Sequence, residues 1–189
     1  MESPIIIVAG MPRSGTSLMM QMLAAGGVPA LTDHLREADE DNPRGYFEFE
    51  AVKQVGRNAG WLDQAPGKAV KMVYLLLYDL PMDRRYRVIF MKRDLSEVVA
   101  SQDEMLRRHG EDTGGAGEAE LVEIYRRQLA RVEGWLAEQP NVDVLYVDHH
   151  EVLARPELVV ARIGDFLGQQ LDTDAMLRVP DRSLYRQRR

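Results

Sequence analysis

The feature that most constrains the fold of this 189-residue chain is a short glycine-containing loop near its N-terminus. An apolar run, Ile5–Ala9, leads directly into Gly10-Met11-Pro12-Arg13-Ser14-Gly15-Thr16-Ser17, and a helical pattern follows over residues 17–25. When a buried strand, a tight loop and a helix follow one another, the N–H groups of the loop and the positive end of the helix dipole converge on an anion. The sequence therefore predicts a strand–loop–helix unit that binds a phosphate or sulfonate group.

The residue at position 16 distinguishes two kinds of phosphate-binding loop. The spacing matches the nucleotide-triphosphate pattern G-x4-G-K-S/T, except that Thr16 stands where the lysine should be. That lysine reaches the β- and γ-phosphates of a triphosphate, so its absence disfavours ATP chemistry. Arg13 supplies a cationic group from another point of the loop, and Ser14, Thr16 and Ser17 supply hydroxyl donors beside Gly15. This combination favours a terminal sulfonate or a single phosphate.

The hydrophobic periodicity predicts alternating strands and helices. Continuous apolar runs, typical of strands buried on both faces, cover residues 5–9, 88–91 and 142–147. Residues 69–77 are a fourth strand candidate, although their leucine-rich end leaves a helix as the alternative. Helical patterns cover residues 17–25, 95–108, 118–138 and 156–167. We therefore expect one α/β domain over residues 1–189, with three layers and a mainly parallel central sheet flanked by helices. Its ligands should bind beyond the carboxyl ends of the strands.

A second basic site is predicted at the end of the strand over residues 88–91. Arg93 and Asp94 follow this strand after one lysine, and Asp94 with Glu97 has the spacing of a helix-capping box. Arg93 should therefore lie at the carboxyl end of a strand, with Ser101 about two turns into the next helix.

Two motifs resemble those of sulfotransferases that use 3′-phosphoadenosine-5′-phosphosulfate (PAPS). The loop Pro12–Ser17 resembles the 5′-phosphosulfate loop of that family, and the Arg-x7-Ser spacing from Arg93 to Ser101 resembles its 3′-phosphate site. The resemblance implies a P-loop-like nucleotide-binding fold and transfer of a sulfuryl group from PAPS to a hydroxyl or amine, which releases 3′-phosphoadenosine-5′-phosphate (PAP). It also implies that Arg13 holds the bridging oxygen and stabilises the leaving phosphate, and that no metal is required.

Two aspartates offer a competing interpretation as magnesium ligands, because Asp94 and Asp148 each end an apolar run. Helix capping explains Asp94 better. The segment from Tyr146 to Asp148 resembles the late strand–loop–helix of the sulfotransferase family, where its role is mainly structural.

A general base should lie near Arg13, because the acceptor must lose a proton as it attacks sulfur. The histidine that many cytosolic family members carry after a Lys-Thr pair is absent, and Lys71-Met72-Val73 occupies this neighbourhood. Residues 42–48 resemble a segment of small bacterial-type sulfotransferases, and other branches of the family use glutamate. Glu48 is therefore the candidate base, Glu50 is the alternative, and Lys71 is a candidate second cation near the sulfonate. A surface or capping role is the competing interpretation for Glu48 and Lys71, and His109, His149 and His150 are interpreted as surface residues.

The last eight residues, 182–189, contain four arginines and no acid. In the family that the chain resembles, a basic segment near the C-terminus covers the 3′-phosphate, which makes Arg186 a candidate ligand. The alternative is a solvated tail.

The composition of the chain limits the classes of partner that are expected. The net charge of −6 argues against a nucleic-acid-binding surface, and no apolar stretch approaches the roughly 18 residues that span a bilayer. Since the chain contains no cysteine, disulfides and thiolate metal sites are excluded, and a cytoplasmic location is expected. The acceptor is expected to be a small molecule, a carbohydrate or a peptide bound by residues 29–66 and 109–118, in a pocket that is open or completed by a homodimer.

Two other functions stay open at this point. One is a P-loop kinase or other nucleotide phosphotransferase, against which Thr16 and the Arg93–Ser101 pair argue. The other is a PAP- or nucleotide-binding module that has lost its chemistry, an interpretation that the missing histidine permits.

Overall fold

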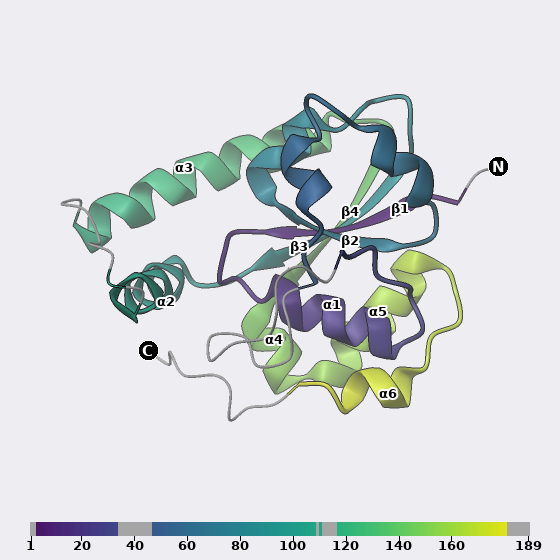
Figure 1. Cartoon of the computed structure of the whole chain (residues 1–189). Coiled ribbons are helices and arrows are strands. Elements are labelled where there is room, and N and C mark those ends of the chain that lie inside the picture. The colour runs from purple at the N-terminus through teal and green to yellow at the C-terminus, as the bar shows by residue number, and fades with distance from the viewer. Residues whose placement is uncertain (1–2, 34–46, 109, 111–116, 181–189) are drawn as a thin grey trace.

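A parallel sheet of four strands runs through the middle of the molecule (Figure 1). The computed structural model describes residues 3–33, 47–108, 110 and 117–180. The strands are β1 (Ile5–Gly10), β2 (Ala69–Val73), β3 (Tyr86–Lys92) and β4 (Val142–Asp148), in the order β2-β1-β3-β4. Gly10 pairs with Val73 on one side and with Met91 on the other, and Met91 pairs with Val147. The carboxyl ends of all four strands therefore lie level along one edge of the sheet.

The central position of β1 explains why its sequence is apolar throughout. Each of its six residues is buried, because β2 and β3 flank it and both faces of the sheet are covered. Ile5, Ile7 and Ala9 belong to the core on one face, whereas Ile6 and Val8 belong to the core on the other. This alternation divides the interior into two apolar layers.

Helices cover both faces of the sheet. The face of Ile6 and Val8 is covered by α1 (Thr16–Ala25), α5 (Pro156–Leu167) and α6 (Thr173–Leu177). The opposite face is covered by α3 (Glu118–Ala137) and by three 3-10 helices, η1 (Glu50–Gln54), η2 (Gly60–Gln64) and η3 (Tyr74–Asp79). Figure 1 shows α3 above the sheet and α1, α5 and α6 below it. The remaining helices are α2 (Leu95–Arg108), which packs against α3, and α4 (His149–Ala154), which follows β4. In the part of the chain that the structure describes, no helix is both long and apolar enough to cross a bilayer.

The three-layer α/β architecture and its parallel sheet are confirmed, and the fourth strand candidate is divided in two. Residues 69–73 form β2, and a 3-10 helix begins at Tyr74. Tyr74, Leu77 and Leu80 are buried, whereas Leu75 and Tyr78 are exposed. This spacing of three residues matches the 3-10 period and cannot continue a strand, whose side chains alternate.

Candidate functional site

The loop after β1 is shaped by two glycines and one strained arginine. Gly15 has a φ of 96° and Arg13 a φ of 72°, so both lie in the left-handed region. A Cβ on Gly15 would lie 2.5 Å from Cδ2 of His149, and a Cβ on Gly10 would lie 2.8 Å from the carbonyl oxygen of Met91. Glycine is therefore required at both positions, because no side chain fits between this segment and the end of β3 or the start of α4.

The His149 side chain packs against this loop at Gly15. It is buried at the start of α4, where Asp148 caps the helix by accepting bonds from the backbone N–H groups of His150 (2.7 Å) and Glu151 (3.3 Å). Burial and the nearby Arg93 guanidinium lower the pKa of His149 to about 4, so the imidazole is neutral at physiological pH. The interpretation of His149 as a surface residue is wrong. The carboxyl ends of β1 and β4 lie at the same edge of the sheet, so the residue after β4 packs against Gly15 and is buried.

Arg13 reaches from the loop to α2. Its Nε donates a hydrogen bond to Oγ of Ser101 at 2.9 Å, and the Ser101 side chain is buried. One residue later, Gln102 Nε2 donates to the carbonyl oxygen of Pro12 at 3.3 Å. The structure thus brings together the two positions, 88 residues apart in sequence, that were predicted to face opposite ends of the same ligand.

Arg93 lies at the carboxyl end of β3, as predicted, and is held by two partners. Its Nε donates to Oε2 of Glu97 at 2.9 Å, and its Nη1 donates to the carbonyl oxygen of Arg13 at 3.0 Å. Asp94 caps α2 through the backbone N–H groups of Ser96 (2.9 Å) and Glu97 (3.3 Å). Sequence reasoning missed the contact between Arg93 and Glu97, although their spacing of four residues is typical of an ion pair near a helix start.

A second ion pair lies beside the first turn of α1. Lys71 extends from β2, with its Nζ 3.3 Å from Oε1 of Glu48 and 3.4 Å from Oγ of Ser17. The Glu48 backbone is anchored because its carbonyl oxygen accepts a bond of 2.8 Å from Thr32 Oγ1. Glu50, the alternative base, begins η1 and forms an exposed ion pair with Lys53. The two carboxylates therefore occupy different environments, and only that of Glu48 is in contact with Lys71 and the loop–helix junction.

Both aspartates that were candidate magnesium ligands are helix caps. Asp94 caps α2 and Asp148 caps α4. Within the described ranges, no three histidine, aspartate or glutamate side chains gather in a group that could hold a metal ion.

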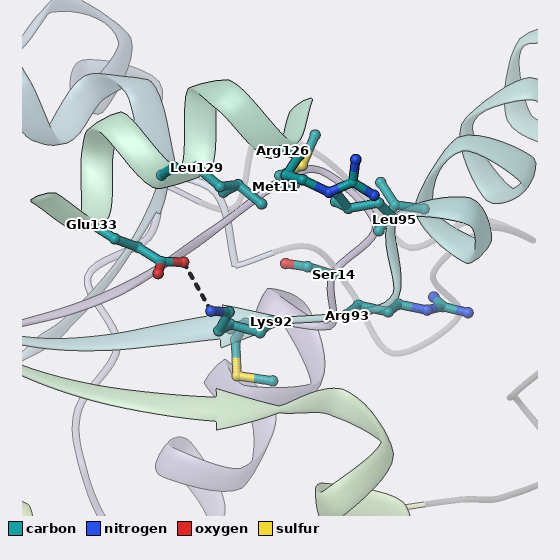
Figure 2. A pocket seen from close by; sticks show the side chains of 11 residues that line it. Met11, Ser14, Lys92, Arg93, Leu95, Arg126, Leu129 and Glu133 are labelled. Atoms are coloured by element: carbon teal, nitrogen blue, oxygen red, sulfur yellow. Dashed lines mark ion pairs between the residues drawn. The ribbon is translucent and has the colours of Figure 1, made fainter. Parts of the chain in front are cut away.

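A cavity of about 260 Å³ opens beside the loop, between β3 and α3 (Figure 2). Ser14 Oγ is buried there and has no hydrogen-bond partner among the residues that the structure describes. Figure 2 shows Lys92 and Glu133 joined across the cavity, with Nζ 2.9 Å from Oε1. Most of the remaining lining is apolar; the full set is Met11, Ser14, Met91, Lys92, Arg93, Leu95, Val98, Arg126, Leu129, Ala130 and Glu133.

The remaining predicted site residues divide between the described part of the chain and the part outside it. Arg186 and most of the segment 42–48 lie outside the described residues, so the role of Arg186 stays a prediction. Thr16 and Ser17 begin α1, directly after Gly15.

The assembled site places cationic side chains near the carboxyl ends of the strands and suits an anionic ligand. Arg13 contacts Ser101 on α2, Lys71 contacts Ser17 in the first turn of α1, and Arg93 lies at the end of β3. The positive end of the α1 dipole adds to this field. A buried hydroxyl without a partner, Ser14 Oγ, indicates a polar group that protein atoms alone do not satisfy.

Comparison with known proteins identifies the family of this domain. The family model described as sulfotransferase domain matches residues 3–188. A sulfotransferase from Mycobacterium tuberculosis has 20% sequence identity and a TM-score of 0.62, with 93% of this chain and 71% of that chain covered. A mouse sulfotransferase in complex with PAP has 15% identity and a TM-score of 0.58, with coverages of 93% and 61%. A retinol dehydratase in complex with androsterone and inactive cofactor PAP has 20% identity and a TM-score of 0.53, with coverages of 92% and 62%. The search of curated proteins gives no match. At these identities the solved structures establish a common fold.

Proposed function

Because the chain belongs to the sulfotransferase domain family, we propose that it transfers a sulfuryl group from PAPS to a hydroxyl or amine of an acceptor and releases PAP. The observation that carries this proposal is that Arg13, in the loop after β1, contacts both Arg93 at the end of β3 and Ser101 on α2. PAPS carries phosphate groups at both the 5′ and 3′ positions, and this arrangement offers a cationic group for each.

Different residues of the site bind the 5′ end and the 3′ end of PAPS. On the 5′ side, the loop N–H groups at Ser14 and Gly15, the hydroxyls of Thr16 and Ser17, and Arg13 bind the phosphosulfate. On the 3′ side, Arg93 and Ser101 bind the phosphate, with Arg186 as a further contact. The presence of PAP in two of the similar structures supports this choice of donor.

The transfer breaks the bond between sulfur and the bridging oxygen of PAPS and forms a bond between sulfur and the acceptor oxygen or nitrogen. The acceptor oxygen or nitrogen attacks sulfur, the bond between sulfur and the bridging oxygen of the 5′-phosphate breaks, and PAP leaves with that electron pair. The acceptor proton passes to the carboxylate of Glu48. Arg13 and Lys71 stabilise the negative charge that develops on the leaving phosphate and the sulfonate oxygens.

The cavity beside the loop supports a small acceptor. Its volume of about 260 Å³ exceeds the space of about 150 Å³ that holds benzene in an apolar cavity, so one substituted ring fits. Its lining is mainly apolar and does not include Glu48 or Lys71, so the reacting hydroxyl of the acceptor must extend beyond the cavity, past Ser14, to meet the sulfur and the Glu48 carboxylate. A carbohydrate or peptide acceptor would enter only with a terminal group.

The proposed function predicts label transfer from radiolabelled PAPS to a one-ring hydroxyl compound such as 4-nitrophenol. Because no metal takes part in the proposed step, the rate should be the same with and without EDTA. Chromatography of the products measures the transfer and the release of PAP. A screen of one-ring alcohols, phenols and amines that gives no labelled product from any acceptor would contradict the proposal.

The cavity can be tested in the same assay with Ala130→Trp, because Ala130 lines the cavity from an exposed position on α3. The indole should narrow the cavity and raise the KM for 4-nitrophenol roughly tenfold, the factor that corresponds to about 1.4 kcal/mol. The affinity for PAP should stay within twofold. Ala119→Trp, at an exposed position on the same helix outside the cavity, is the matched control. An unchanged KM in Ala130→Trp would place the acceptor elsewhere.

A further inference from the structure

Arg93 is fixed at two different edges of its guanidinium group. Nε donates to Glu97 at 2.9 Å and Nη1 donates to the carbonyl oxygen of Arg13 at 3.0 Å. The Arg93 and Glu97 side chains are only 10% and 9% exposed. Because the guanidinium is planar and rigid, contacts at two of its nitrogens fix both the position of the plane and its rotation. The direction of its remaining N–H groups is therefore set before any ligand binds.

The position of Glu97 is unfavourable in simple electrostatic terms. A carboxylate beside a phosphate-binding arginine repels the phosphate, and a buried carboxylate must also lose its hydration. This cost is offset if the carboxylate improves the geometry of the arginine, since binding is strengthened when the donors are already oriented. Glu97 lies on the first turn of α2, and Asp94 anchors the backbone N–H of the same residue at 3.3 Å. The carboxylate is thus attached to a rigid support.

We propose that Glu97 is the positioning residue of the 3′-phosphate site, holding the Arg93 guanidinium in the orientation that receives the 3′-phosphate of PAPS. This inference rests on the proposed function. It also assigns Glu97 an effect on the loop, because the arginine that it orients holds the carbonyl oxygen of Arg13, whose backbone lies in the left-handed region.

The neighbours of Arg93 are consistent with this role. His149 lies nearby, and burial together with the Arg93 charge lowers its pKa to about 4, so the imidazole adds no second positive charge beside Glu97 at physiological pH. Ser101, one turn after Glu97 on the same helix, accepts a hydrogen bond from Arg13. Two cross-links, Glu97–Arg93–Arg13 and Arg13–Ser101, therefore join α2 to the loop.

The test separates orientation from charge with two conservative variants. Glu97→Gln keeps the length of the side chain and an oxygen that accepts from Nε, but removes the negative charge. Glu97→Asp keeps the charge but shortens the side chain by one methylene, so that it cannot reach Nε in the same geometry. The measured quantity is the ratio of the affinities for PAP and adenosine 5′-phosphate (AMP), obtained by calorimetry, because only PAP carries the 3′-phosphate.

Glu97→Gln should keep the wild-type PAP-to-AMP ratio or exceed it, since repulsion of the phosphate disappears. Glu97→Asp should lower the ratio at least fivefold. A purely structural role would change the melting temperature and leave this ratio unaltered. Glu104→Ala provides the control, because Glu104 forms an ion pair with Arg108 at the same spacing on the exposed part of α2. Its ratio should equal that of the wild type.

Two results would overturn the positioning role of Glu97. One is an unchanged PAP-to-AMP affinity ratio in Glu97→Asp. The other is a fall of this ratio in Glu97→Gln that is as large as its fall in Glu97→Asp. A wild-type protein that binds PAP no more tightly than AMP would instead contradict the proposed function, so the two failures are distinguishable.

Discussion

Replacing Glu48 by glutamine is expected to lower turnover with PAPS by roughly 10²- to 10⁴-fold, the usual contribution of a general base. Glutamine cannot accept the acceptor proton, although it can still contact Lys71, whose Nζ lies 3.3 Å from the carboxylate. Because Glu48 touches neither Arg93 nor Ser101 in the described contacts, the affinity for PAP should stay within about threefold. Steady-state kinetics and calorimetry measure the two quantities separately.

The matched control for this variant is Glu50→Gln. Glu50 lies two residues further along the chain, but its carboxylate forms an exposed ion pair with Lys53. Turnover of this control should equal that of the wild type. Wild-type turnover in Glu48→Gln, or an equal loss in both variants, would mean that another group accepts the proton.

The second large effect is expected on binding. Arg93→Ala should weaken the binding of PAP by about 2–3 kcal/mol, because a charge-assisted contact to the 3′-phosphate is lost. This corresponds to a roughly 30- to 150-fold lower affinity. AMP lacks this phosphate, so its affinity should change much less. The variant also leaves the Glu97 carboxylate without the guanidinium that lies 2.9 Å away, and a lower melting temperature is expected as well. Calorimetry on the folded variant provides the affinities.

Arg107→Ala controls for the loss of one positive charge, because Arg107 is an exposed arginine on α2. Its affinity for PAP should equal that of the wild type at physiological salt. If Arg93→Ala binds PAP and AMP as the wild type does, Arg93 is not the 3′-phosphate ligand.

Much of the fold could be predicted from the sequence because its signals are local. A run such as Ile5–Ala9 has only one stable environment, the middle of a parallel sheet covered on both faces. The bounds of α2 and α5 were also predicted, since apolar periodicity marks both helices, with the Asp94 cap before α2 and a proline at the start of α5. The division at Tyr74 was not predicted, because periods of two and three residues are difficult to distinguish within nine residues.

The candidate site was predictable only in part. The positions of Arg13, Arg93 and Ser101 follow from strand ends, which the sequence indicates. The burial of His149 beneath Gly15 depends on the register between β3 and β4, and the sequence alone does not define that register. The roles of these residues, the cytoplasmic location and a homodimer stay predictions.

The most direct test of the central claim, that this is a PAPS site, is calorimetric titration of the wild-type protein with PAP in EDTA, compared with ATP in the presence of Mg²⁺. We predict tight binding of PAP without metal and binding of ATP that is at least 100-fold weaker, since Thr16 occupies the position of the triphosphate-binding lysine. Binding of ATP with Mg²⁺ that is as tight as that of PAP, or no binding of PAP at all, would contradict the account.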